Sequence, residues 1–354
     1  MNLNEAFEAP ASAIVLAEGE FGDTGGKTAN GVVMHSELFD VRAVIDSESA
    51  GESARTVLGA ASAPDAPVVA SLTEALEIEP APEALIVGVA PVGGTLPEPW
   101  IETIQDAMAA GCAVVSGLHI FLDDDPEWRA LADEHGVRIF DVRKPPADET
   151  LRVADGRVDD LDARVVLVMG TDCAVGKRTT TFELYRAAVD RGIDAGWVAT
   201  GQTGIMVGAQ RGVVIDRVPA DFTAGVVEDL VCDVAAAHDV VFVEGQASLT
   251  HRAYSGVTLS ILHGSWPDAV VLADDPQRRS RTHFEQFDIE GITAERTLIE
   301  ELSDADVVAI STWGDAAAVT ETIGLPAGNI YDERGTGAIL EPVIDAIQLE
   351  RMHS

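Results

Sequence analysis

A glycine-rich segment that ends in a lysine is the part of this sequence best suited to chemistry. In RVVLVMGTDCAVGKRTT an apolar run leads to Gly170, a short loop extends to Gly176, and Lys177 opens a helix-like stretch. Strand, loop, lysine and helix in this order are typical of a phosphate-binding loop. Backbone N–H groups of such a loop point inward, the helix N-terminus adds partial positive charge, and the lysine reaches a phosphate oxygen. The sequence therefore predicts a bound phosphate group.

We expect the whole loop and the first helical turn to contact this ligand. The residues are Gly170, Thr171, Asp172, Cys173, Ala174, Val175, Gly176, Lys177, Arg178, Thr179 and Thr180. The loop departs from the common P-loop twice, because five residues separate its glycines and Arg178 stands where Ser or Thr normally ligates Mg²⁺. Thr179 or Thr180 offers a replacement hydroxyl, so a Mg²⁺ requirement stays open. No other metal site is predicted, since the cysteines and histidines lack ligand spacing.

A second group of polar residues follows the apolar run DVVFVEG. Glu244 ends this run, where it could bind a metal, accept a proton or position an amine. The residues that follow it are Gln246, Ser248, His251, Arg252 and Tyr254. Open α/β sheets bind ligands at the carboxyl ends of their strands, so we expect this group beside the phosphate loop. TGQTG, which contains Gln202 and Thr203, follows another strand and is expected at the same edge.

Three glycine-rich segments in the first half of the chain also follow apolar runs. GDTGGKTANG contains Lys27 and Asn30, SGLH contains Ser116 and His119, and PVGGTLPEPW spans residues 91–100. Such loops at strand ends are candidates for ligand binding. Lys27 is the best candidate among them, because the chain has only three lysines and two of these directly follow glycines.

The composition excludes several classes of protein. Sixty acidic residues against 23 basic ones give a net charge of −37, and such a chain repels nucleic-acid phosphates. No apolar run reaches the roughly 18 residues of a membrane span, and the N-terminus does not resemble a secretory signal. We therefore expect a cytoplasmic protein without nucleic-acid or membrane partners. We also expect a homo-oligomer, a dimer. Because the acids alternate with regular apolar runs, they indicate a folded protein whose hydrated surface suits molar salt.

Apolar runs alternate with helix-like segments, which predicts an α/β fold with mainly parallel sheets. A polar, proline-containing stretch at residues 144–160 is typical of a linker, so we predict α/β domains at residues 1–150 and 151–354. Strands are expected at AIVLA, VRAVID, ALIVGV, CAVV, VRIFDV, RVVLVMG, AGWVAT, DVVFVEG, AVVLAD and DVVAIS. Helices are expected at residues 99–110, 126–135, 177–191, 295–302, 315–323 and 337–348.

Several of these segments together resemble one family. GTDCAVGKRTT, TGQTG and VEGQASLTHRAYSGVTLSILHGS, with GGKTANGVV and VSGLH nearer the N-terminus, are similar to a family long catalogued as a domain of unknown function. Its characterised bacterial members are D-glutamate N-acetyltransferases. The similarity covers most of the chain and is most specific from Gly170 to Ser265. The resemblance implies a Rossmann-like domain followed by a P-loop NTPase-like domain, acetyl-CoA as donor, and an acidic amino acid, D-glutamate, as acceptor.

Roles for the polar residues follow from the implied reaction. Acyl transfer to an ammonium needs a base and donors for the thioester oxygen. Glu244 and His251 are the candidate bases, with Glu244 favoured, and Gln246 or Ser248 would serve the oxyanion. Acceptor binding is expected from Lys27, Asn30, Ser116, His119, Gln202, Thr203, Arg252 and Tyr254. We expect direct transfer, because no histidine lies near Cys173 in the sequence to activate it as a nucleophile.

Two other functions stay open at this point. The spacing GTDCAVGK also resembles the loop of dethiobiotin synthetases, which would suit an ATP-dependent ligase or kinase. A nucleotide-sensing module without chemistry would need phosphate binding alone. Mg²⁺-dependent ATP turnover would indicate the first function, and binding without turnover would indicate the second.

Overall fold

The chain divides into two compact units in the computed structural model, which describes residues 1–91, 96–281 and 284–348. One unit contains Met1–Pro145 and Gly201–Ala209, and the other contains Pro146–Thr200 and Gln210–Ser354. The sequence did not indicate that Gly201–Ala209 belongs to the first unit. Residues 92–95, which belong to the glycine-rich loop expected at 91–100, lie outside the described residues.

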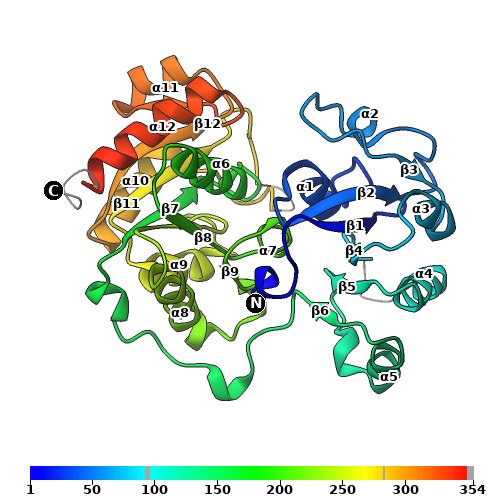
Figure 1. Cartoon of the computed structure of the whole chain (residues 1–354). Helices are drawn as coiled ribbons and strands as arrows, with labels where there is room; N and C mark the ends of the chain where they lie inside the picture. Colours follow the sequence, from blue (N-terminus) through cyan, green and yellow to red (C-terminus); the bar gives the residue numbers. More distant parts are fainter. Residues whose placement is uncertain (92–95, 282–283, 349–354) are drawn as a thin grey trace. The chain divides into compact units, whose positions relative to one another are not determined.

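The first unit is built on a six-stranded parallel sheet in the order β3-β2-β1-β4-β5-β6 (Figure 1). Its strands are β1 (Ala11–Leu16), β2 (Phe39–Ile45), β3 (Val68–Val69), β4 (Ala84–Val87), β5 (Ala113–Ser116) and β6 (Ile139–Asp141). Its helices are α1 (Lys27–His35), α2 (Ala54–Leu58), α3 (Leu72–Ile78), α4 (Glu98–Ala109), α5 (Pro126–His135) and α7 (Gln202–Val207). Every residue of β4 is buried, as expected for a parallel strand covered on both faces.

The second unit contains a seven-stranded parallel sheet in the order β13-β12-β11-β7-β10-β8-β9. Its strands are β7 (Arg164–Gly170), β8 (Ala195–Ala199), β9 (Arg211–Gly212), β10 (Val240–Glu244), β11 (Ala269–Asp274), β12 (Asp306–Thr312) and β13 (Ala327–Gly328). Its helices are α6 (Lys177–Asp190), α8 (Thr223–Ala235), α9 (Ser255–Ser265), α10 (Gly291–Leu302), α11 (Ala316–Ile323) and α12 (Glu333–Ala346).

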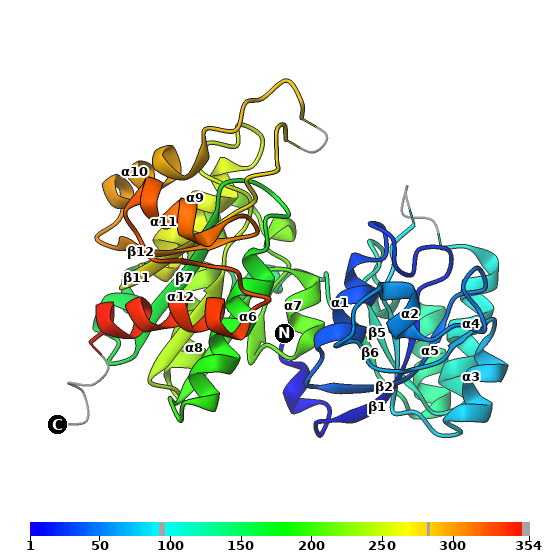
Figure 2. The same cartoon turned by 90° about the horizontal axis from the view of Figure 1, so that it is seen from above.

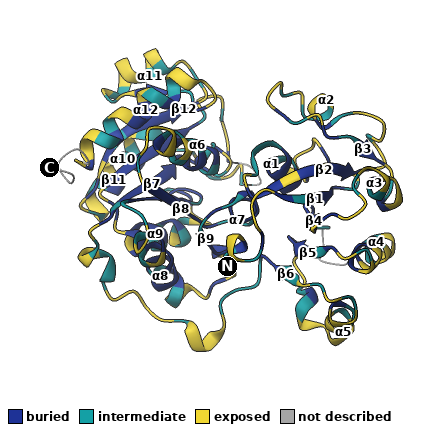
Figure 3. Ribbon diagram, in the orientation of Figure 1, coloured by how far each residue is buried: buried dark blue, intermediate teal, exposed yellow. Residues whose placement is uncertain are grey.

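Helices cover both faces of the second sheet. Val165, Leu167 and Met169 of β7 share one core with residues of α8 and α9, and the alternate residues of a strand point to the opposite face. That face is packed by α6 and α12, which lie side by side in both views (Figures 1 and 2). Figure 3 shows buried strands between helices whose outer faces are exposed. Because all strands are parallel, their carboxyl ends share one edge of the sheet.

The predicted α/β class and the mainly parallel sheets are confirmed. Every expected strand and helix is present, with α10 and α12 beginning about one turn earlier than expected. The earlier start of α12 has a local cause, because Asp332 caps the helix by accepting the Arg334 N–H. Within the described residues, no helix has the length and apolar character needed to cross a membrane.

Candidate functional site

The phosphate loop connects β7, which ends at Gly170, to α6, which begins at Lys177. Ala174 at φ 54° and Gly176 at φ 100° adopt left-handed backbone conformations, which curl the loop. A Cβ atom on Gly170 would lie 2.8 Å from Cγ2 of Val175, so the loop returns closely over the strand end. The expected order of strand, glycine loop, lysine and helix is present.

Hydrogen bonds tie this loop to the neighbouring strands. Thr171 donates its backbone N–H to the Ala273 carbonyl at 3.0 Å and its hydroxyl to Oδ1 of Asp274 at 2.8 Å. The Thr180 hydroxyl lies 2.8 Å from the Ser311 hydroxyl on β12, and both are buried. Thr180, one of the two expected replacements for a Mg²⁺-ligating hydroxyl, is therefore engaged between α6 and the sheet.

Lys177 is buried, and its Nζ donates to the backbone carbonyl of Asp172 within the loop. Burial lowers the pKa of Lys177 from 10.5 to about 8, although nearby Cys173, Asp172 and Glu244 favour the charged form. Burial also lowers the pKa of the Arg178 guanidinium, with Glu244 again acting in the opposite direction. An anionic phosphate would add further negative charge that favours the charged form of both side chains.

A buried ion pair joins the loop to the segment that follows β10. Arg281 is 0% exposed, and its Nη1 donates to Oδ1 of Asp172 at 2.9 Å and to the Ser248 hydroxyl at 3.1 Å. Its Nη2 donates to the Thr250 hydroxyl at 2.8 Å, and its Nε donates to the Asp288 carbonyl at 2.8 Å. Arg281 thus fixes Asp172 against Ser248 and Thr250. The sequence pattern does not single out Arg281, whose only signal is its place in an arginine-rich stretch after β11.

Glu295 holds the same segment from the other side. Its carboxylate accepts the backbone N–H groups of Leu249 and Thr250, both at 2.9 Å, together with the Thr250 hydroxyl. Glu295 lies on α10 and is 0% exposed. The segment after β10 is therefore anchored by two buried charged residues, Arg281 and Glu295, whose roles the sequence pattern did not indicate.

His251 lies against the phosphate loop. Its side chain is buried, and its Nε2 lies 3.9 Å from Oδ1 of Asp172. Its Nδ1 accepts the Ala253 N–H at 3.2 Å, so the neutral ring carries its proton on Nε2. Burial and the Arg281 charge lower the pKa of His251. At neutral pH the ring therefore presents an N–H donor toward the loop. Tyr254 and Phe284 pack against it, with ring centroids 4.8 and 5.2 Å away.

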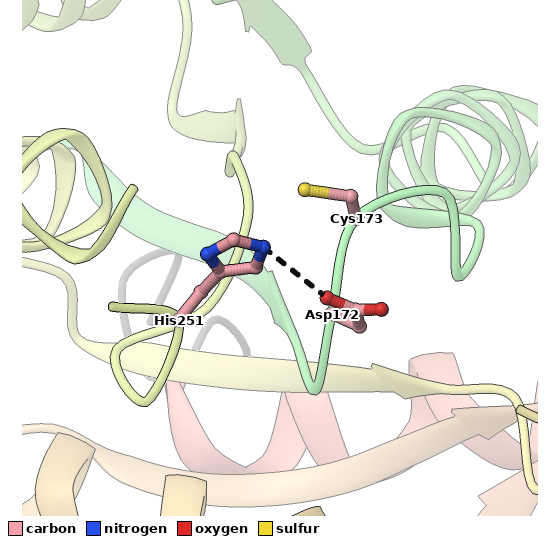
Figure 4. Close-up of side chains that lie close together, drawn as sticks. All are labelled: Asp172, Cys173 and His251. Carbon is pink, nitrogen blue, oxygen red and sulfur yellow. Dashed lines mark ion pairs between the residues drawn. The ribbon is translucent and has the colours of Figure 1, made fainter. Parts of the chain in front are cut away.

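Asp172, Cys173 and His251 converge, as Figure 4 shows. One potential ligand atom from each lies within 4.8 Å of the other two. Metal binding would need a thiolate, whereas burial raises the pKa of Cys173. The guanidinium of Arg281 already engages Asp172 and would repel a divalent cation. A cation at these three residues would therefore have to compete with Arg281 for Asp172.

Glu244 lies at the carboxyl end of β10, next to β7 in the sheet. It is buried, its Oε2 accepts the Thr200 N–H at 3.1 Å, and its backbone carbonyl accepts the Thr200 hydroxyl at 2.7 Å. The Gln246 amide in turn donates to the Thr200 hydroxyl at 2.9 Å. A Cβ atom on Gly245 would lie 2.2 Å from the Val168 carbonyl, so glycine is required there. The structure thus brings Glu244 and Gln246 together as the sequence indicated.

Arg252 and Tyr254 lie at the outer part of this segment. The Arg252 guanidinium lies 4.8 Å from the centroid of the Phe287 ring, and Tyr254 is 44% exposed. Both residues are exposed, in contrast to the neighbouring His251. They are therefore accessible to a ligand.

The remaining candidates belong to the first unit. Lys27 is exposed at the first turn of α1, and Asn30 shapes the preceding turn by accepting the Gly22 N–H and donating to the Asp23 carbonyl, both at 3.0 Å. Ser116 is buried at the end of β5, and His119 is exposed.

Gln202 and Thr203, which were expected at the carboxyl edge of the second sheet, directly follow β8 in the chain and group with the first unit. Both contact Thr28 at the start of α1. The Gln202 amide donates to the Thr28 hydroxyl at 2.7 Å, and the Thr203 and Thr28 hydroxyls lie 3.0 Å apart. Arg143 donates to the Gln202 amide oxygen at 2.7 Å. These hydrogen bonds to Thr28 on α1 are the physical reason why Gln202 and Thr203 group with the first unit. The sequence pattern did not show them.

Two parallel α/β units, the second with a glycine loop and a buried lysine after its central strand, define a P-loop protein with a Rossmann-like partner unit. Residues 152–340 match the P-loop domain, and residues 47–145 the Rossmann-like domain, of a family described as a domain of unknown function, DUF1611. The chain belongs to this family, which includes the D-glutamate N-acetyltransferases.

Relatives at moderate identity cover most of the chain. A D-glutamate N-acetyltransferase from Pseudoalteromonas sp is 33% identical over 75% of this chain and 78% of its own length. One from Tritonibacter scottomollicae is 35% identical over 73% of this chain and 80% of its own length. The crystal structure of a DUF1611 family protein from Anabaena variabilis is similar with a TM-score of 0.83 at 34% identity, over 96% of this chain and 99% of that one.

Proposed function

We propose that this protein transfers the acetyl group of acetyl-CoA directly to the amine of an acidic amino acid, D-glutamate. Two relatives are named D-glutamate N-acetyltransferases. The observation that most supports the donor is the phosphate loop, where Lys177 is buried and Arg178 replaces the usual Mg²⁺-ligating hydroxyl. Acetyl-CoA carries a pyrophosphate and a 3′-phosphate, so such a loop can bind it without phosphoryl transfer.

In the proposed reaction the acceptor enters as an ammonium. Glu244 takes one proton, the freed amine attacks the thioester carbon, the C–S bond breaks, and the CoA sulfur takes the second proton. Glu244 then releases its proton to solvent. The hydrogen bond from Thr200 holds the Glu244 carboxylate in one orientation, which supports a role as a positioned base. His251 suits a donor better, because its unprotonated Nδ1 already accepts the Ala253 N–H.

The surroundings of Cys173 support direct transfer over an acetyl-cysteine intermediate. The structure does bring a histidine to Cys173, which the sequence did not reveal. That histidine, His251, presents a protonated Nε2 and has no free nitrogen to take the thiol proton. Burial also raises the pKa of Cys173, so the thiol is poorly activated.

The oxyanion and the acceptor's carboxylates need donors and cations. Gln246 is the better oxyanion candidate, because it is partly exposed, whereas Ser248 is fully buried against Arg281. For the carboxylates we propose Arg252, which is exposed. A guanidinium binds a carboxylate through two parallel hydrogen bonds.

The test is to incubate the protein with acetyl-CoA and D- or L-glutamate or aspartate in high salt while free thiol is measured. We expect thiol release that depends on the acceptor and is fastest with D-glutamate. A parallel reaction contains MgATP in place of acetyl-CoA and tests for the activity of a ligase or kinase. ATP turnover, with no thiol released for any acceptor, would overturn the proposal in favour of a ligase or kinase.

A further inference from the structure

Two exposed aromatic side chains lie beside the phosphate loop. Trp313 is 37% exposed and Tyr331 is 60% exposed, and their ring centroids lie 6.2 Å apart. The Trp313 indole covers Gly176, since a Cβ atom on that glycine would lie 2.9 Å from its Nε1. Tyr331 lies near this glycine through its contact with the Trp313 ring. Both rings therefore lie at the point where the loop enters α6.

The backbone that carries these rings is firmly anchored. The backbone N–H of Trp313 donates to the carbonyl of Asp274, at the end of β11, at 3.2 Å. A Cβ atom on the next residue, Gly314, would lie 2.4 Å from Pro276, so the turn packs closely. Tyr331 donates its N–H to Oδ1 of Asn329 at 3.0 Å. Two large exposed rings beside the phosphate loop offer an apolar surface that a bound ligand can contact.

We propose that Trp313 and Tyr331 form a stacking platform for the adenine ring of the CoA donor. The inference rests on the proposed function, because the occupant is the nucleotide end of that donor. A pyrophosphate bound by the backbone near Gly176 places the base one ribose away, beside these rings. Aromatic side chains stack on bases through their faces, and adenine is uncharged at neutral pH. It can therefore approach this acidic protein without the repulsion that an anion meets.

The platform is tested by comparing ligands with and without adenosine. Dissociation constants for CoA, ADP and 4′-phosphopantetheine are measured by calorimetry for the wild type, Trp313→Ala and Tyr331→Ala. We expect Trp313→Ala to weaken CoA and ADP binding about 5- to 100-fold, the range for loss of one stacked base. Binding of 4′-phosphopantetheine, which lacks the base, is expected to stay within about twofold by the same argument. Trp313→Phe, which keeps a ring, is expected to restore most of the loss.

Trp266→Ala is the matched control, because Trp266 has the same 37% exposure in the same unit and takes no part in the proposed platform. It is expected to leave all three constants unchanged. Equal effects of Trp313→Ala on CoA and 4′-phosphopantetheine, or no effect on either, would overturn the platform while leaving the acetyltransferase proposal standing. A change in oligomeric state without a change in ligand affinity would also overturn it, in favour of a contact between copies. Failure of the wild type to bind CoA or ADP would instead contradict the proposed function itself.

Discussion

Arg281 donates a 2.9 Å hydrogen bond to Asp172 across 109 residues of sequence, and neither side chain is exposed. The same guanidinium bonds Ser248 and Thr250. One buried ion pair therefore fixes the phosphate loop relative to the segment after β10. Such a pair adds little net stability compared with apolar packing, but removal of one partner leaves the other charge buried and uncompensated.

Replacing Arg281 by Met should destabilise the second unit strongly. The Asp172 carboxylate would stay buried without the cation closest to it, since the Arg278 guanidinium lies 3.8 Å from its Oδ2, and the expected cost is about 3–5 kcal/mol in the free energy of unfolding. Arg164→Met is the control, because Arg164 makes a 2.8 Å ion pair with Asp268 but is 40% exposed, and exposed pairs contribute up to about 1 kcal/mol. Chemical denaturation measures both values. Similar losses for the two variants would show that the Arg281 pair has no special role.

Lys177 should make phosphate binding depend on pH above neutrality. Burial lowers its pKa to about 8 in the free protein, so it is charged below that pH and becomes neutral above it. A bound phosphate favours the ammonium, and binding above pH 8 must therefore take up a proton. We expect the dissociation constant of acetyl-CoA to rise up to about tenfold per pH unit above pH 8. Calorimetry in buffers of different ionisation enthalpy detects the proton uptake.

Two variants separate this effect from other titrations. Lys177→Arg keeps its charge at all these pH values and should flatten the pH dependence of the dissociation constant, whereas Lys177→Ala should weaken binding at all pH values below 8, by about 1.5–3 kcal/mol.

The lowered pKa of Lys177 also makes the stability of the free protein depend on pH. Between pH 8 and 10.5 the unfolded state binds more protons at this lysine, so its contribution to stability rises with pH. A pH-independent affinity in the wild type would remove Lys177 from the phosphate site.

The sequence was most informative where structure is local. The apolar run before Gly170, the glycines and Lys177 are neighbours in the chain, and together they predicted β7, the loop and α6. Alternation of apolar runs with helix-like segments predicted the parallel sheets for the same reason. These features depend on backbone hydrogen bonding and burial within short windows, so one sequence suffices to find them.

Contacts between distant segments could not be predicted in this way. Arg278, Arg279 and Arg281 are close in sequence, but only the fold shows that Arg281 is the one fully buried against Asp172. The excursion of Gly201–Ala209 into the first unit depends on hydroxyl and amide contacts to Thr28, which no periodic pattern encodes. Side-chain pairing over long separations is specified by the packed structure as a whole.

Stability should depend on salt concentration. The net charge of −37 makes the carboxylates repel one another, and dilution from about 3 M to 0.1 M KCl lengthens the Debye length from below 3 Å to about 10 Å. We expect the melting temperature to fall over this range and the fold to weaken in dilute buffer. Potassium chloride is compared with an equal osmolality of sucrose to separate screening from solute exclusion. An unchanged melting temperature would contradict a surface suited to molar salt.

The identity of the base is tested with Glu244→Gln and His251→Asn. If Glu244 takes the ammonium proton, Glu244→Gln should lower kcat about 10²- to 10⁴-fold while acetyl-CoA affinity changes little. This role requires the pantetheine arm to fold back, so that the thioester lies near the end of β10. A carboxylate that acted on the phosphates instead would change the dissociation constant of acetyl-CoA more than kcat.

The pH profile separates His251 from Glu244. Because burial and Arg281 lower the pKa of His251, a histidine base would give an acidic limb below the ordinary value of about 6.5. We expect His251→Asn to keep the shape of the wild-type profile, since Nε2–H acts as a donor and an amide can replace it. Near-wild-type kcat in Glu244→Gln, together with loss of the acidic limb in His251→Asn, would reverse the assignment and make His251 the base.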